Sequence, residues 1–159
     1  LAEANAYAEA HGLIPMAVSS PHVCLATAIE PFWPKCTQAS HSDLLWYAEH
    51  TIPVLAWSSQ GRGFFLDYSG PDDRGHPDLV RVYHNESNFE KLRRVRELAR
   101  ARGVAPVEIA LAYVLNLPAP IVALVGPATV AEIDSCVAAS ELEVTPDDMA
   151  WLDLRCEKA

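Results

Sequence analysis

The sequence predicts an α/β fold in which short parallel strands alternate with helices. Helix-like and strand-like segments follow one another in the order helix, strand, helix, strand, helices, strand, helix, helix. Alternating units of this kind form parallel sheets with right-handed crossovers. The strand-like segments are apolar along their whole length, which is typical of strands with both faces covered.

The N-terminal part begins with a helix and a strand. Residues 1–12 are predicted to form the end of a helix, because alanine and glutamate dominate and Gly12 stands where a terminating glycine belongs. The apolar run from Ile14 to Val18 is predicted to be a short strand, and residues 19–41, with three prolines, an irregular loop. Because the first helix begins at Leu1 without a cap, we expect a piece of a longer chain.

The middle of the chain continues the alternation. Ser42-Asp43 is expected to open a short helix that ends before the proline at the start of the next strand. That strand is predicted over residues 53–57, and a polar turn with two glycines follows over residues 58–63. Residues 67–86 are predicted to form a long polar loop.

The second half contains the longest predicted helix. Ser87 and Glu90 have the spacing of a capping box, which predicts the start of a helix that Gly103 ends. Pro106 is expected at the first position of the next helix. The apolar run from Ile121 to Val125 is then predicted to be a buried strand.

The last two helices have clear start signals. After a turn over residues 126–128, Thr129 and Glu132 are predicted to cap a helix that ends near Ala139. Residues 145–148, Thr-Pro-Asp-Asp, are expected to begin the final helix.

Composition excludes several classes of function. Half of the residues are hydrophobic and the net charge is -9, which argues against a nucleic-acid or anionic-membrane surface. No apolar run is long enough to cross a bilayer, and no signal peptide is expected. The four cysteines form no C-x-x-C pair and the six histidines are scattered, so we expect no metal site and reduced thiols. A cytoplasmic protein is the resulting expectation.

Two other groups of residues have simple explanations. His41, Ser42 and Asp43 are adjacent in the sequence, but a hydrolytic triad is assembled in space. Ser42 and Asp43 are therefore interpreted as a helix cap. Five arginines between residues 93 and 102 lie on one predicted helix with two glutamates. A solvated helix face is favoured there over a binding patch.

Four stretches, taken together, resemble the aldo/keto reductase family. They are PVLAWSSQGRGFF (53–65), APVEIALAYVL (105–115), IVALVGPATVAEIDSCVAA (121–139) and EVTPDDMAWLD (143–153). The resemblance implies the C-terminal half of a (β/α)8 TIM barrel, with parallel strands six to eight, as one partial domain over residues 1–159. The family's catalytic Asp, Tyr, Lys and His belong to the other half, so no catalytic residue is assigned in this chain.

A phosphate site is predicted where the last strand leads into the following helix. Gly126-Pro127-Ala128 and a capped helix point free backbone N–H groups and the positive end of the helix dipole at one spot. Gly126 allows a ligand to approach the backbone closely. An ordinary strand–turn–helix junction is the alternative, and the resemblance favours the phosphate site.

The resemblance implies a nicotinamide dinucleotide cofactor and assigns further residues to it. Trp57 takes the position of the family's aromatic ring that stacks against nicotinamide; core packing is the alternative for this side chain. Ser58, Gln60 and Arg62 are expected to line the pyrophosphate, with Arg62 supplying compensating charge. Ser20 lies near the position of the family's carboxamide-contacting glutamine. The expected cofactor-binding residues are Ser20, Trp57, Ser58, Gln60, Gly61, Arg62, Gly126, Pro127, Ala128, Thr129, Glu132 and Ser135.

One departure from the family concerns the choice of cofactor. Residues 126–142 contain no Lys or Arg, whereas Glu132 and two further residues are acidic. The family uses basic side chains there to hold the 2′-phosphate of NADPH, and carboxylates suit a ribose hydroxyl instead. Ser135 and Cys136 stand where the family has an adenine-contacting Glu-Asn pair. We therefore expect NAD(H) rather than NADP(H), or a weakened cofactor site.

Three functions remain open on the sequence. The chain is part of an NAD(P)-dependent reductase of carbonyl substrates, or a non-catalytic half-barrel binding or assembly module, or a truncated product with no independent role. Strands cut from a closed barrel expose two edges. We therefore expect pairing with an N-terminal half barrel or self-association.

Overall fold

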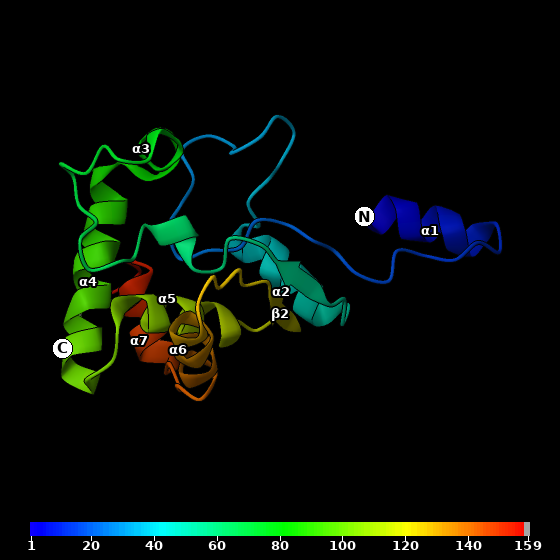
Figure 1. Cartoon of the computed structure of the whole chain (residues 1–159). Coiled ribbons are helices and arrows are strands. Elements are labelled where there is room, and N and C mark those ends of the chain that lie inside the picture. The colour runs from blue at the N-terminus through cyan, green and yellow to red at the C-terminus, as the bar shows by residue number, and fades with distance from the viewer. Residues whose placement is uncertain (158–159) are drawn as a thin grey trace.

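The computed structural model describes residues 1–157 as an α/β structure with a small parallel sheet. Its elements are α1 (Ala2–Ala10), α2 (His41–Glu49), β1 (Val54–Ala56), the 3-10 turn η1 (Gly61–Gly63), α3 (Pro77–Tyr83), α4 (Glu86–Arg102), α5 (Pro106–Leu115), β2 (Ile121–Ala123), α6 (Val130–Ser140) and α7 (Pro146–Leu152). Figure 1 shows α3 to α7 gathered into one body, while α1 projects away on an extended segment. The predicted α/β class with parallel strands is confirmed.

A two-stranded parallel sheet is flanked by a third parallel segment, which isolated bridges join to β1. β1 and β2 pair with Val54 opposite Ile121. Residues 19–23 flank β1 on its other side, where the Leu55 N–H donates to the Ser19 carbonyl over 2.8 Å. The order of segments is therefore 19–23, β1, β2.

The strand predicted from Ile14 to Val18 is misplaced. This segment has no regular structure, and Ile14 is 94% exposed. Pro15 offers no N–H to a strand ladder. Pairing with β1 begins at Ser19, so the apolar run precedes the paired segment instead of forming it.

β2 is shorter and less buried than the strand predicted over Ile121 to Val125. The strand ends at Ala123, and Val122 is 51% exposed. Leu124 and Val125, beyond the strand, are also exposed. Among residues 1–157, β2 has a strand partner only on its β1 side, so its other edge and part of its apolar surface face solvent.

The loop predicted over residues 67–86 contains α3, which the prediction missed. Pro77 occupies the first turn of this helix, where its missing N–H is tolerated. Leu79, Val82 and Tyr83 are buried. Their spacing of three and four residues is helical, so the sequence did contain the signal.

α4 begins after Asn85, and the capping box predicted for Ser87 and Glu90 does not form. The Asn85 side chain accepts the Asn88 N–H over 2.9 Å. Two arginines of the same helix bind Glu90 instead. The predicted end of the helix is confirmed, because Gly103 terminates it with a φ of 69°.

Three other helices begin at Ser or Thr caps. Ser40, not Ser42, caps α2 within a capping box. Thr129 caps α6 by accepting the Glu132 N–H, and Thr145 caps α7. The predictions for α6 and α7 are therefore confirmed, and the start of α2 lies earlier than predicted.

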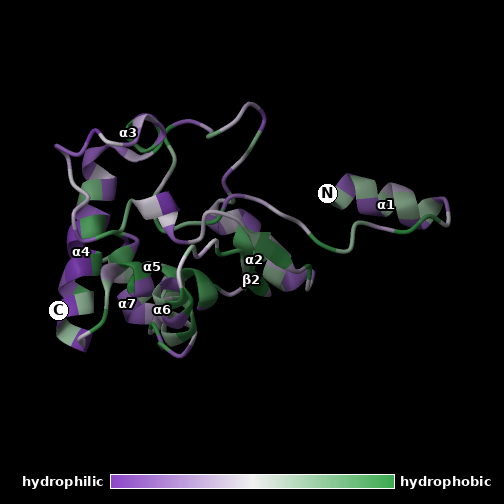
Figure 2. Cartoon of the chain, in the orientation of Figure 1, coloured by the Kyte–Doolittle hydropathy of each residue, from purple (hydrophilic) through white to green (hydrophobic). Residues whose placement is uncertain are grey.

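The hydrophobic core lies around α5. This helix is buried along most of its length and packs against α4, α6 and β2. Figure 2 shows its apolar residues inside the body and the polar outer face of α4. Large side chains that are fully buried include Tyr83, Phe64, Phe65, Leu92, Ile109 and Leu152.

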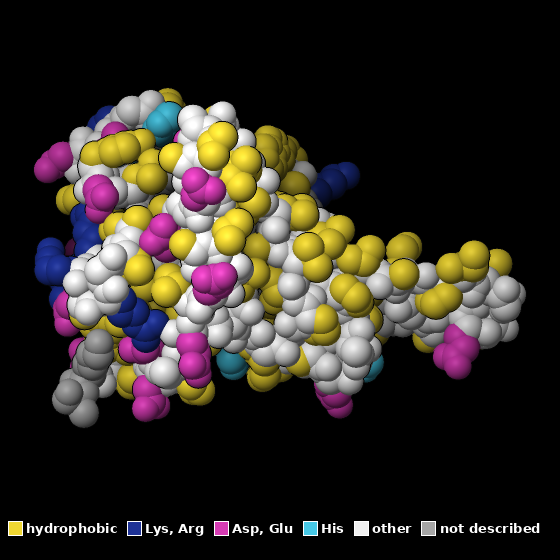
Figure 3. All heavy atoms as spheres, turned by 60° about the horizontal axis from the view of Figure 1, so that its bottom comes forward, with side chains coloured by type: hydrophobic (Ala, Val, Ile, Leu, Met, Phe, Trp, Pro, Cys, Tyr) yellow, Lys and Arg dark blue, Asp and Glu magenta, His cyan; other side chains and the backbone are white. Residues whose placement is uncertain are grey.

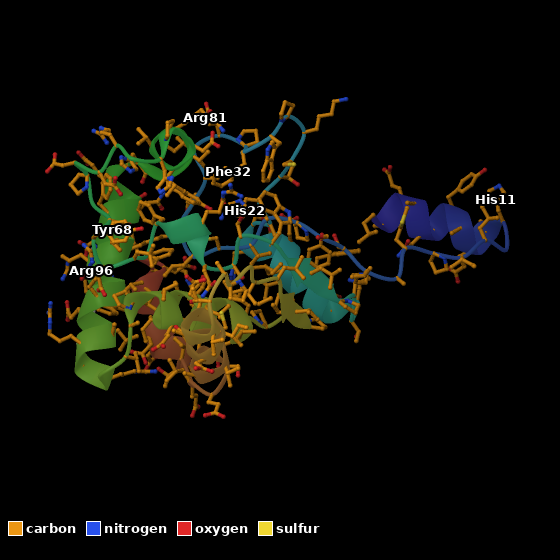
Figure 4. All side chains as sticks on the ribbon, viewed as in Figure 1. His11, His22, Phe32, Tyr68, Arg81 and Arg96 are labelled. Atoms are coloured by element: carbon orange, nitrogen blue, oxygen red, sulfur yellow. The ribbon has the colours of Figure 1, made fainter. Side chains whose placement is uncertain are left out.

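The arginines of α4 do more than face solvent. Arg93 pairs with two glutamates on the outer surface. Arg94 is 4% exposed, and its Nη1 donates to the Trp151 carbonyl over 2.8 Å. Arg96 lies beside the loop that carries Tyr68 (Figure 4) and donates to the Asp67 carbonyl over 2.8 Å. The predicted solvated face is confirmed for Arg93 and wrong for Arg94, which fastens α4 to the C-terminal segment.

Candidate cofactor site

Two loops that the sequence assigns to a cofactor meet at one cavity. The cavity has a volume of about 480 Å3 and opens between the turn after β1, residues 58–63, and the segment from the end of β2 into α6, residues 124–136. This volume is typical of small-molecule sites. Seven of the twelve predicted residues line it, namely Ser58, Gln60, Arg62, Gly126, Pro127, Glu132 and Ser135.

The two strands place these loops side by side. Because β1 and β2 are parallel neighbours, the loops leave from the same edge of the sheet, where ligands bind in parallel α/β folds. The Leu124 N–H donates to the Ala56 carbonyl over 2.9 Å, and the Ser59 hydroxyl donates to the Leu124 carbonyl over 3.0 Å. Ser59, which is not among the predicted site residues, fastens the two loops together.

The turn after β1 has a strained backbone. Four of its residues have a positive φ, namely Ser58 (56°), Gly61 (69°), Arg62 (53°) and Gly63 (97°). For Ser58 and Arg62 this conformation costs about 1–2 kcal/mol each. A Cβ at Gly61 would lie 3.0 Å from the Phe65 ring, so this position requires glycine. Strained turns of this kind concentrate at binding loops.

The second loop carries its own carboxylate at the start of α6. Oε2 of Glu132 accepts the Ala128 N–H over 2.6 Å, while Thr129 Oγ1 accepts the Glu132 N–H over 3.2 Å. The acidic side chain therefore occupies part of the predicted anion site. A Cβ added to Gly126 would meet no atom within 4 Å, so the cavity has open space beside this residue.

Two polar contacts tie the remaining cavity residues to the scaffold. Ser135 Oγ donates to Glu108 Oε1 over 2.9 Å, and the other oxygen of Glu108 accepts the Ala105 N–H at the start of α5 over 2.9 Å. Gln60 Nε2 lies 3.6 Å from Cys136 Sγ. This contact joins the two loops across the cavity.

The other five predicted residues do not line this cavity. Trp57 is half-buried and lines a different cavity, of about 570 Å3. Ser20 is exposed, and its hydroxyl donates to the Leu55 carbonyl over 3.0 Å. The remaining three residues belong to the two loops that border the 480 Å3 cavity but do not line it, namely Gly61, Ala128 and Thr129.

Arg62 directs its charge toward two aromatic rings. Its Cζ lies 5.0 Å from the Phe32 ring centroid and 5.3 Å from that of Trp33. No ion pair with a carboxylate is formed by Arg62 in the part of the chain that the structure describes. The side chain thus borders the cavity, while its guanidinium makes cation–π contacts with two rings that do not line it.

A buried histidine lies next to this charge and against Trp57. The His22 ring stacks on the indole of Trp57 with ring centroids 4.6 Å apart and an interplanar angle of 21°. Its Nε2 lies 2.8 Å from the hydroxyl of Tyr83. Burial, with the nearby positive charge of Arg62, lowers the pKa of His22 from 6.5 to about 4. The ring is therefore uncharged at neutral pH.

Comparison with known proteins decides the family. Residues 2–154 match the sequence model of the aldo/keto reductase family. The chain belongs to the aldo/keto reductase family. It is similar to versiconal hemiacetal acetate reductase of Aspergillus parasiticus, with 33% identity over 109 residues, which are 64% of this chain and 32% of that protein. The match thus spans about a third of the length of this curated relative.

In this aldo/keto reductase chain, the contacts that organise the site join residues far apart in the sequence. The stacking of His22 on Trp57 and the hydrogen bond from Ser59 to Leu124 were not predicted, because neither follows from local spacing.

Over residues 1–157, no helix is long and apolar enough to span a membrane.

Proposed function

We propose that this chain is the cofactor-binding part of an NAD(P)-dependent reductase that converts aldehydes or ketones to alcohols. The observation that carries the proposal is the shared cavity, where the turn after β1 meets the start of α6. The family resemblance assigned both loops to the cofactor, and they border the same space. Family membership supports a nicotinamide cofactor and a carbonyl substrate.

The residues around the cavity fit the pyrophosphate and adenosine portions of a dinucleotide. Ser58 and Gln60 carry side-chain donors at its wall, and Gly126 leaves room for a ligand at the backbone. Trp57 offers a flat aromatic surface at the adjacent strand end for the nicotinamide ring. When bound, the nicotinamide supplies the hydride that adds to the carbonyl carbon.

The three parallel segments correspond, in this proposal, to strands six to eight of a (β/α)8 barrel. The segment 19–23, β1 and β2 follow one another in space as they do in the chain. The residues that activate the carbonyl belong to the other half of such a barrel. This chain alone is therefore expected to bind the cofactor without turnover.

NAD(H) is the proposed cofactor rather than NADP(H). The Glu132 carboxylate lies at the N-terminus of α6 beside the cavity, and residues 126–142 contain no Lys or Arg. A negative charge disfavours a 2′-phosphate and accepts hydrogen bonds from a ribose hydroxyl. Arg62, the basic residue at the cavity wall, has its guanidinium over Phe32 and Trp33.

The proposed partner is an N-terminal half barrel or a second copy of the chain. Apolar side chains along α6 are exposed, Val130 at 73% and Val137 at 55%, and one edge of β2 has no strand partner within residues 1–157. On the face seen in Figure 3, apolar side chains are interspersed with acidic ones, and some also lie on the projecting α1 end. Surfaces of this kind favour association.

A non-catalytic half-barrel module is the second candidate function. The observation that favours it is the same Glu132 carboxylate, because it already accepts the Ala128 N–H that a phosphate would use. In that case the chain retains the fold and the association surface, and cofactor binding is weak or lost.

Calorimetric titration with NADH and NADPH distinguishes the two candidates. The reductase proposal predicts saturable binding of NADH, weaker binding of NADPH, and loss of NADH affinity in Gly126→Val at an unchanged unfolding midpoint. Gly70→Val is the matched control, because a Cβ there also meets no atom within 4 Å and the residue lies outside the cavity. Absence of heat with both nucleotides favours the non-catalytic module.

A further inference from the structure

We propose that His22 is a positioning residue for Trp57 and that Tyr83 holds His22 in place. In this arrangement the imidazole supports one face of the indole and leaves the opposite face to the nicotinamide ring. The inference rests on the proposed function, because it takes nicotinamide as the ligand of Trp57.

The geometry around Trp57 singles out His22. The two rings lie 4.6 Å apart at 21°, which is a stacked arrangement. Trp33 and Phe32 approach the same indole at steeper angles, 51° and 68°. Of these three neighbours, only His22 lies flat against Trp57. The proposal places the nicotinamide ring on the opposite face of the indole.

His22 is itself held at both its backbone and its ring. Its N–H donates to the Thr37 carbonyl over 3.1 Å, and its carbonyl accepts the Ala39 N–H over 2.9 Å. The ring is hydrogen-bonded to the hydroxyl of Tyr83 over 2.8 Å, and His22 and Tyr83 are 2% and 0% exposed. Loss of the tyrosine hydroxyl would leave the imidazole free to turn out of the stack.

The charge state of His22 suits this role. Burial and the charge of Arg62 keep its pKa well below neutrality, so the ring behind Trp57 is uncharged. The oxidised nicotinamide ring is cationic, and an imidazolium behind the indole would repel it. A neutral imidazole supports the stack with either redox form of the cofactor.

The same contacts also fit a purely structural role, in which His22 and Tyr83 simply fill the core. The two roles differ in their effect on ligands. A structural role affects every part of the cofactor site through general loss of order. A positioning role affects only ligands that carry the nicotinamide ring.

The test compares NADH with ADP-ribose, which lacks nicotinamide, by titration of the full chain. His22→Leu is expected to weaken NADH binding by about 3- to 10-fold, the value of one aromatic pair, and to leave ADP-ribose affinity unchanged. Tyr83→Phe is expected to shift NADH affinity in the same direction by less. The double variant His22→Phe/Tyr83→Phe restores a ring that can stack on Trp57 and leaves no buried hydroxyl without a hydrogen-bond partner. NADH affinity is expected to return toward the wild-type value.

Tyr47→Phe is the matched control, because it also removes a hydrogen-bonded tyrosine hydroxyl, which lies 2.9 Å from Ser19 Oγ, and Tyr47 does not line the cavity of His22 and Trp57. If His22→Leu does not fold, the comparison of Tyr83→Phe with Tyr47→Phe decides. Equal NADH affinities in these two variants, or parallel loss of NADH and ADP-ribose binding, overturn the positioning role. A wild-type chain that binds neither ligand overturns the cofactor site and this inference together. A wild-type chain that binds ADP-ribose as tightly as NADH overturns only this inference, because the nicotinamide ring then adds nothing to binding.

Discussion

Glu132 places a carboxylate oxygen 2.6 Å from the backbone nitrogen of Ala128, at the start of α6 and at the wall of the cavity. The residue therefore fastens the segment before α6 to the first turn of the helix. It also contributes a negative charge to the space where the adenosine end of a dinucleotide is proposed to bind. These two roles can be separated by substitution.

Glu132→Gln is expected to strengthen NADPH binding. The amide oxygen can still accept the Ala128 N–H, while the charge that repels a 2′-phosphate is gone. Removal of one like-charge contact at the surface is worth about 1 kcal/mol, or roughly fivefold in affinity. NADH affinity is expected to change less, because the amide oxygen can still accept a hydrogen bond from a ribose hydroxyl. Glu141→Gln, at the other end of α6, is the control, and an unchanged NADPH/NADH ratio in Glu132→Gln contradicts the assignment.

His22 is expected to make stability depend on pH. Its pKa is about 4 in the folded chain and 6.5 as the ordinary value, so the unfolded chain binds more protons between these values. The contribution of His22 to the free energy of unfolding is therefore fully present above pH 6.5. It is lost as the pH falls toward 4, and the total loss is about 3 kcal/mol. Urea unfolding of the wild type and His22→Gln at pH 7 and pH 4.5 measures this. Identical pH dependence in the two proteins would show that His22 contributes nothing.

The strained turn after β1 is expected to tolerate substitution poorly at Gly61. Gly61→Ala places a Cβ 3.0 Å from the Phe65 ring at a φ of 69° and is expected to destabilise the fold by about 1–3 kcal/mol. Gly70→Ala has open space and no positive φ, so its unfolding midpoint is expected to match the wild type. Equal midpoints for the two variants would remove the argument for a required glycine.

The exposed apolar surface is expected to cause self-association of the isolated chain. Light scattering after size exclusion is expected to give a mass above that of one chain. Val137→Lys adds a charge on α6 at a residue that is 55% exposed, and is expected to shift the population toward the monomer. A monodisperse wild-type monomer would count against this expectation.

Sequence patterns predicted the features that depend on local physics. Gly103 ends α4, and Thr129 and Thr145 cap their helices, because capping is decided within one turn. The meeting of the loops after β1 and β2 was also predictable, since parallel neighbouring strands bring their carboxyl ends together.

The failures share a different cause, since each depends on tertiary surroundings. The apolar run that contains Ile14 looked like a buried strand, yet no packed surface in the described chain covers it. The stack of His22 on Trp57 and the bond from Ser59 to Leu124 join residues that no periodicity connects. The two loops proposed to bind the cofactor could therefore be predicted from the sequence, whereas the contacts that hold them could not.

Hydrogen exchange in the presence of NADH tests whether the two loops form one dinucleotide site. Saturating NADH is expected to slow exchange of backbone amides in both residues 58–63 and residues 126–132, and Gly126→Val is expected to abolish the protection at both. Protection of neither loop, or protection confined to another part of the chain, would contradict the proposal that these loops form one dinucleotide site.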